Sequence, residues 1–301
     1  MDNNKLYNLS MELLKNKNKS VEFSMNKNEL HDNDYFVSNI EIDEFLPETP
    51  TETGYIEEKE IKKSILSLIK FNIELGLYPV VYQGENDGRL IRNVAPKKSA
   101  KNQVSSHGYF HDFFPHVDNP DLMINGDSLK NTPCPDTLSL LCLKKEDNVF
   151  TSIIRLDDVL TDLSQKDINL LKEHNYIVKR PDSFEGSSQM VENLPLINEY
   201  NGKYYSRFDY HNVLSEKKEN NDALEKLRKS SMDKNKWIEL SLNPGQVVIF
   251  NNQRTLHTRN AFQPRFDGND RWLLRLFALY QKPEESYLLS QECNHHLKVT
   301  G

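Results

Sequence analysis

The chain has 301 residues, and 38 Lys and Arg face 45 Asp and Glu, so its formal net charge is −7. A net negative charge argues against a general nucleic-acid binder, which needs a basic face. No apolar run approaches the roughly 20 residues that cross a bilayer. Aromatic residues make up 10% of the chain, which excludes wholesale disorder.

The beginning of the chain differs in composition from the rest. Residues 1–35 are rich in Asn and Lys and either form a short helix around Asn8–Leu14 or pack loosely, and residues 41–54 are proline-containing and acidic, as a surface linker is. We expect residues 1–55 to be an extension that packs on a single domain over 56–301. The missing signal region and three widely spaced cysteines favour a cytoplasmic protein with reduced thiols.

Apolar side chains recur at helical spacing over residues 61–75 and stop at Gly76, which predicts an amphipathic helix. Further helical patterns cover 156–173 and 216–231. Short strand-like runs bounded by turn residues fill much of the remainder; they are 79–82, 104–106, 137–143, 150–156, 203–208, 237–240, 247–251 and 272–280. This order predicts an α+β, mainly β protein with a double-stranded β-helix, or jelly-roll, core flanked by helices.

The sequence FFPHVDNP contains His116 and Asp118, which share one face if this segment is a strand. His257 comes much later, just after an apolar strand. Two histidines and one carboxylate with open positions opposite are the ligand set of non-haem Fe(II) oxygenases. A lone His-x-Asp is common by chance, and several other histidines are equally available: His107, His111, His211, His295 and His296.

Two arginines follow in RFDGNDRWLLRLF. Arg271 and Arg275 are four residues apart, so a strand would turn both toward one face. Buried arginines are costly unless each meets an anion, and a guanidinium can bind a carboxylate through two parallel hydrogen bonds. The alternative is pairing with Asp267 or Asp270, or solvent exposure, which the apolar run WLLRLFALY disfavours.

The spacing of these five residues, together with PGQVVIFNNQRTLH before and F-x-PRFDGNDRWLLR after, resembles the clavaminate-synthase-like branch of the Fe(II)/2-oxoglutarate dioxygenases related to TauD and TfdA. The resemblance extends from about Tyr78 to Tyr280. That branch includes hydroxylases of free asparagine, arginine and lysine.

The resemblance implies a role for each matching position. His116, Asp118 and His257 would be the iron ligands, with 2-oxoglutarate and O₂ as co-substrates. Arg271 would bind the distal carboxylate of 2-oxoglutarate, assisted by Thr151, unless Thr151 is an ordinary strand residue. Because Asp118 is retained as a ligand, we expect hydroxylation and not halogenation.

The same resemblance implies an amino-acid site. Arg275 would hold the α-carboxylate and Glu85 the α-ammonium, although Glu85 in its turn could equally be a solvated acid. Ser106 and Val104 would line the pocket wall.

The far end of the pocket is less defined. Asp209 and His211 stand where relatives that take a guanidinium place two acids; Asp209 favours a cationic or amide side chain, whereas His211 could be a strand histidine without substrate contact. Residues 179–198 and 211–235 are candidate lids, because water must be excluded from the reaction.

We therefore expect an iron-dependent hydroxylase acting on Cβ or Cγ of a free polar or basic L-amino acid, with no nucleic-acid or membrane partner. One alternative is desaturation, cyclisation or action on a carrier- or peptide-bound residue by the same scaffold. A more distant one is a non-catalytic jelly-roll binding protein. The sequence leaves the oligomeric state open.

Overall fold

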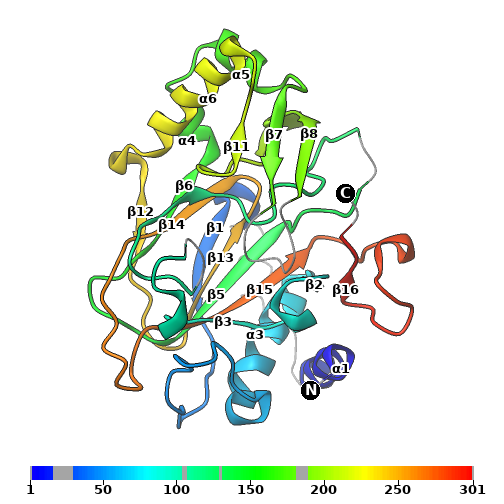
Figure 1. The fold of residues 1–301 in the computed structure, drawn as a ribbon. Helices are drawn as coiled ribbons and strands as arrows, with labels where there is room; N and C mark the ends of the chain where they lie inside the picture. The colour runs from blue at the N-terminus through cyan, green and yellow to red at the C-terminus, as the bar shows by residue number, and fades with distance from the viewer. Residues whose placement is uncertain (1, 16–29, 104–106, 129–130, 181–188, 300–301) are drawn as a thin grey trace.

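The computed structural model describes residues 2–15, 30–103, 107–128, 131–180 and 189–299. Figure 1 shows the sheets at the centre, with α4 (Leu156–Leu160), α5 (Gln165–Leu171) and α6 (Lys218–Ser231) at one end and α1 (Asn3–Lys15) and α3 (Lys62–Glu74) at the other. None of the helices within the described residues combines the length and apolar character needed to span a bilayer.

The larger sheet has seven strands in the order β1-β13-β5-β15-β2-β16, and β3 also pairs with β15. All of its pairs are antiparallel except that of β16 with β2. The strands are β1 (Tyr35–Asn39), β13 (Gln246–Asn251), β5 (Thr137–Lys144), β15 (Trp272–Leu279), β2 (Tyr78–Tyr82), β16 (His296–Leu297) and β3 (Arg92–Val94).

A four-stranded antiparallel sheet runs β12-β6-β14-β4. Its strands are β12 (Ile238–Leu240), β6 (Thr151–Arg155), β14 (Thr255–Arg259) and β4 (Phe113–His116). Two smaller sheets are formed by β7 (Tyr176–Lys179), β8 (Met190–Leu194) and β11 (Val213–Leu214), and by β9 (Ile197–Tyr200) and β10 (Lys203–Ser206). The helices are α1 (Asn3–Lys15), α3 (Lys62–Glu74), α4 (Leu156–Leu160), α5 (Gln165–Leu171) and α6 (Lys218–Ser231).

The two main sheets contribute to one apolar core, in which Leu140 of β5 and Phe250 of β13 join Ile153 of β6. A second core lies on the other face of the larger sheet, where Leu68 of α3 and Leu274 of β15 belong to one buried cluster. The predicted jelly-roll core with flanking helices is confirmed.

Most predicted elements in the described residues are present within a few residues of their expected limits, but two differ. The helix expected over 156–173 is two helices, because Ser164 and Asp167 form a capping box that starts α5 anew. The predicted linker also makes buried contacts: Thr49 donates its hydroxyl to the Asp270 carbonyl (2.8 Å). The strand expected over 104–106 lies outside the described residues.

The N-terminal extension contacts the domain through α1, which packs against α3 and buries Leu6. In the first predicted lid, over 179–198, residues 181–188 lie outside the described residues. In the other, α6 packs on α4 and α5 and buries Leu224 and Leu227. The division at residue 55 and the lid roles remain predictions.

Candidate metal and anion site

Two adjacent strands bring the candidate histidines together. His116 is the last residue of β4 and pairs directly with His257 on β14, with ring centroids 4.0 Å apart. His257 follows the predicted apolar strand, β13, as expected, and lies within β14, a strand that was not predicted. Asp118 lies beyond the end of β4, against expectation, and Asn252 fixes its backbone through hydrogen bonds of 3.0 Å to its N–H and its carbonyl.

The three side chains converge on one point. One ligand atom from each of His116, Asp118 and His257 lies within 4.8 Å of the others. His116 Nε2 is 3.6 Å from Asp118 Oδ1, and His257 Nε2 is 3.8 Å from Asp118 Oδ2. These atoms can close on a single ion with little movement.

The other ring nitrogen of His116 determines its tautomer. Nδ1 lies 2.8 Å from the Phe114 carbonyl, which can only accept, so Nδ1 carries the proton. In the neutral ring, which is the form that binds a metal, Nε2 then presents a lone pair, and it is buried without a hydrogen-bond partner among the described residues. A metal-binding histidine usually has this arrangement.

The electrostatics also suit a cation. Burial alone would raise the pKa of Asp118, but the charges of Arg275 and the two histidines outweigh it and lower that pKa below its ordinary value. Burial, followed by the charge of His116, lowers the pKa of His257 to about 3. At neutral pH the site therefore offers a carboxylate and a neutral His257 imidazole.

Arg271 lies immediately before β15 and is buried. Its Nη2 donates to Thr151 Oγ1 (2.9 Å), and no carboxylate among the described residues pairs with it. Asp267 instead binds Arg265, and Asp270 accepts the backbone N–H groups of Arg265 and Phe266. Burial lowers the pKa of Arg271 to about 10.

A cavity of about 10 Å³, enough for about one water molecule, is lined by Arg271, Thr151 and Cys142 among others. The guanidinium of Arg271 thus keeps donors available for an anion beside the Thr151 hydroxyl.

Arg275 contacts two carboxylates. Its Nη2 donates to Glu85 Oε1, and its Nη1 donates to Asp118 Oδ2 (3.3 Å). Glu85 is 1% exposed, so it is not a solvated acid. Its Oε2 is buried without a hydrogen-bond partner in the described part of the chain.

Arg92 was not predicted from the sequence. It lies on β3 opposite Arg275, and its Nη1 is 3.5 Å from Glu85 Oε1. Burial, then the charge of Arg275, lowers the pKa of Arg92 to about 10. An arginine in a three-residue strand gives no sequence signal, since RLIRNV alternates too briefly to define a buried face.

The remaining predicted residues lie differently. Asp209 is buried, and its backbone forms an isolated antiparallel β-bridge with that of His116. Its carboxylate accepts hydrogen bonds from the backbone N–H groups of His211 and Asn212 and from the Asn212 side-chain amide. His211 is exposed and stacks on Phe114, with ring centroids 5.0 Å apart. Val104 and Ser106 lie outside the described residues.

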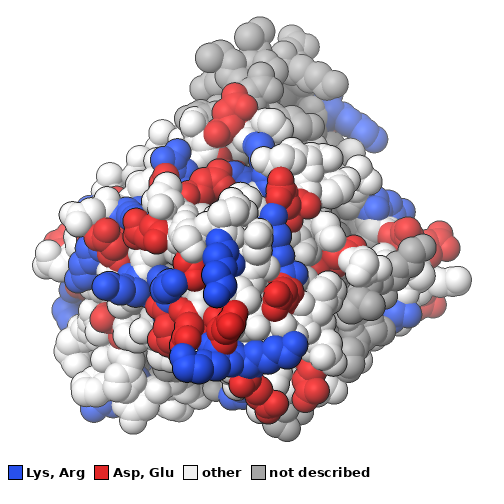
Figure 2. All heavy atoms as spheres, turned by 90° about the horizontal axis from the view of Figure 1, so that it is seen from above, with Lys and Arg blue, Asp and Glu red and all other residues white. Residues whose placement is uncertain are grey.

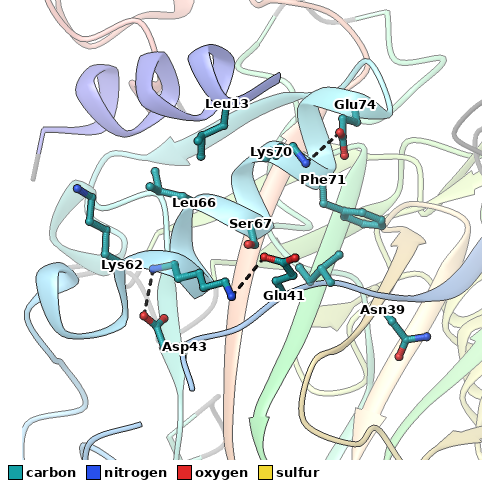
Figure 3. A pocket seen from close by; sticks show the side chains of 12 residues that line it. Leu13, Asn39, Glu41, Asp43, Lys62, Leu66, Ser67, Lys70, Phe71 and Glu74 are labelled. Carbon is teal, nitrogen blue, oxygen red and sulfur yellow. Dashed lines mark hydrogen bonds and ion pairs between the residues drawn. The ribbon is translucent and has the colours of Figure 1, made fainter. Parts of the chain in front are cut away.

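Within the described residues, no second group of three or more His, Cys, Asp or Glu side chains is placed to hold a metal ion. Figure 2 shows acidic and basic side chains interleaved on the face seen from above. A hollow of about 890 Å³ lies between α1, α3 and the end of β1 (Figure 3), and its polar side chains include the ion pair of Lys70 with Glu74 (3.2 Å). Neither the histidines nor the arginines of the site line this hollow.

Comparison with known proteins identifies the family. The profile of the taurine catabolism dioxygenase TauD, TfdA family matches residues 75–277, which include the triad and the three arginines. The chain belongs to this family. As a TauD/TfdA-family protein it is a dioxygenase, in agreement with the resemblance deduced from the sequence.

Individual members of the TauD/TfdA family share low sequence identity with this chain. L-asparagine oxygenase of Streptomyces coelicolor is 25% identical over 255 residues, covering 81% of this chain and 72% of the relative. The structure of an asparagine oxygenase with Fe(II), 2S,3S-3-hydroxyasparagine and succinate superposes with a TM-score of 0.79 at 21% identity, covering 93% of this chain and 84% of the other.

The non-heme iron oxygenase OrfP with Fe, succinate and (3S)-hydroxy-L-Arg gives a TM-score of 0.78 at 22% identity, covering 97% and 90%. At these identities, the two solved structures show that the fold is shared.

Proposed function

We propose that this protein is an Fe(II)- and 2-oxoglutarate-dependent oxygenase that hydroxylates Cβ or Cγ of a free polar or basic L-amino acid and releases succinate and CO₂. The observation that carries the proposal is the convergence of His116, Asp118 and His257 on one point beside buried arginines. When bound, iron and 2-oxoglutarate supply the oxidising chemistry. The chain's own residues bind, orient and shield the reactants.

In this proposal the triad holds the iron. The lone pair of His116 Nε2 and the low pKa of Asp118 support that assignment. Arg271 and Thr151 hold the distal carboxylate of 2-oxoglutarate, because Arg271 is a buried cation without a carboxylate partner among the described residues.

The amino-acid head is clamped by Arg275 and Glu85. Arg275 binds the α-carboxylate, and the bare Oε2 of Glu85 accepts from the α-ammonium. Because Arg275 also contacts Asp118, a head bound there lies next to the iron, which directs Cβ or Cγ toward it. Asp209, beside His116, lies near the substrate's side chain.

The relatives support a free amino acid as the substrate, since one is named for asparagine and a solved neighbour contains hydroxylated arginine. Desaturation, cyclisation or a tethered substrate is the alternative on the same scaffold. A cytoplasmic location is part of the proposal, in line with the three free cysteines.

A substrate screen tests the proposal. The protein is incubated with Fe(II), ascorbate, 2-oxoglutarate and each proteinogenic L-amino acid, ornithine or citrulline, and succinate is measured. We expect O₂-dependent succinate above the background with at least one amino acid, and none with H116A. The H111A variant serves as the matched control, because His111 is an exposed histidine near the same strand. Background succinate with every amino acid contradicts a free-amino-acid substrate.

A further inference from the structure

Arg92 shares the interior face with the proposed substrate-binding residues. In the pairing of β3 with β15, Arg92 lies directly opposite Arg275. Directly opposed residues of an antiparallel pair point to the same side of the sheet, with Cβ atoms roughly 5 Å apart. Two guanidinium groups therefore enter the same space.

The contacts of Arg92 leave most of its donors unused. The side chain is 7% exposed, yet it makes no hydrogen bond to any described residue. Its one ion pair with the described part of the chain is the 3.5 Å approach of Nη1 to Glu85 Oε1, and its Nε is buried with no partner there. A guanidinium has five N–H donors, and a buried charge with so few partners is strongly destabilising unless an anion arrives.

The charges around Arg92 change when the site is loaded. Without metal, Arg92 and Arg275 face Glu85 and Asp118, so two cations meet two anions. If Asp118 is committed to iron, Glu85 alone remains for two arginines. Both guanidinium groups then share the single carboxylate of Glu85, and a carboxylate placed between the arginines gives them a second anionic partner.

We propose that Arg92 is a second arginine of the substrate site and binds the α-carboxylate of the amino acid together with Arg275, an inference that rests on the function proposed above. Glu85 remains between the two guanidinium groups as their shared counter-ion. Its Oε2, which has no partner among the described side chains and backbone groups, stays available to the α-ammonium.

A purely structural role for Arg92 predicts different behaviour. If Arg92 served only to hold Glu85, its removal would weaken binding through the ammonium. An amino acid and its α-carboxamide would then lose affinity equally, since both carry the ammonium. If Arg92 binds the carboxylate, only the acid is affected, because the carboxamide has no charge for Arg92 to meet.

The test compares R92Q and R92K with the matched control R89Q. Arg89 lies three residues away and makes a partly exposed pair with Asp87 (2.9 Å). The ligands are the amino acid with the highest turnover in the screen and its α-carboxamide. The dissociation constants are measured by calorimetry and competition on iron- and 2-oxoglutarate-loaded protein without O₂, and the KM for the amino acid is measured with O₂.

We expect R92Q to weaken binding of the acid by about 10- to 100-fold, the usual effect of losing a charged hydrogen bond. The affinity of R92K for the acid is expected to lie between those of R92Q and wild type, because lysine keeps the charge but cannot bind a carboxylate through two parallel hydrogen bonds. Carboxamide binding, the KM for 2-oxoglutarate and the behaviour of R89Q should stay within about twofold of wild type, and the Tm of R92Q should not fall.

Three outcomes contradict the inference: an unchanged affinity of R92Q for the acid, an equal loss for acid and carboxamide, or a similar loss in R89Q. These failures differ from failure of the proposed function, in which no amino acid supports succinate formation by the wild type.

Discussion

The two faces of the larger sheet contrast most clearly along β15. Trp272, Leu274 and Leu276 belong to the apolar cluster that contains α3. On the opposite face Leu273 and its neighbours border the charged site, where Arg275 contacts Glu85 and Asp118. One face therefore stabilises the fold, whereas the other contains buried charges that destabilise it unless binding partners neutralise them.

The largest effect is expected at the charged face. H116A removes a metal-binding nitrogen, and since even indirect partners of metal ligands are worth about 10- to 100-fold in metal affinity or activity, succinate formation should fall by at least about 100-fold. Iron content and turnover are measured together. Retained iron and activity in H116A would show that the triad is not the metal site.

The apolar face should respond in the opposite way. L274A leaves a cavity against α3 and should lower the free energy of unfolding by about 2–5 kcal/mol. Its KM for 2-oxoglutarate should match wild type at temperatures where it is folded. Chemical denaturation and kinetics provide the check, and L289A, at a 41% exposed leucine, is the control. A large change in KM would mean that the faces are not separable.

Arg271 provides a further test of the difference between the two faces, because its loss should affect binding and not stability. R271Q should raise the KM for 2-oxoglutarate by about 10- to 100-fold, as expected for a lost charged hydrogen bond. Because no described carboxylate loses a partner, the free energy of unfolding should not decrease. R265Q, at a half-exposed arginine paired with Glu146, should change neither quantity by much. An unchanged KM in R271Q contradicts the co-substrate role.

The smallest expected effect is a pH dependence of stability. Burial, then the charge of Arg92, lowers the pKa of His107 to about 4. Between about pH 6.5 and 4 the unfolded chain binds a proton that the folded chain does not, so stability falls as the pH falls through that window, by at most about 1.4 kcal/mol per pH unit. Denaturation of metal-free H107Q should show a flatter dependence than wild type.

The exposed His174 provides the control for that pH series, because H174Q should keep the wild-type slope. A wild-type slope in H107Q would show that other groups produce the dependence.

The sequence predicted which residues form the site better than it predicted where the fold places them. The triad could be found because metal chemistry restricts residue types, and the apolar run around Arg275 indicated a buried strand. The strand β4 was missed because its short segment, FFPH, contains a proline, which argues against a strand in a sequence. The position of Asp118 beyond it depends on Asn252, a contact between distant parts of the chain that no local pattern reveals.

Arg92 and Asp209 show the same limit. The role of Arg92 depends on the register of β3 against β15, which the sequence does not specify. Asp209 matched a substrate-binding position by spacing, yet its carboxylate also stabilises its own turn, as aspartates commonly do. The break between α4 and α5 was in principle readable, since S-x-x-D at residues 164–167 is a helix-start signal.

Turnover under isotopically labelled O₂ tests most directly whether the protein carries out a coupled amino-acid hydroxylation. Mass spectrometry should find one labelled oxygen in succinate and one in the amino acid, with the two products in equal amounts. A product that has lost two hydrogens and gained no label, or succinate formed without any modified amino acid, would contradict it.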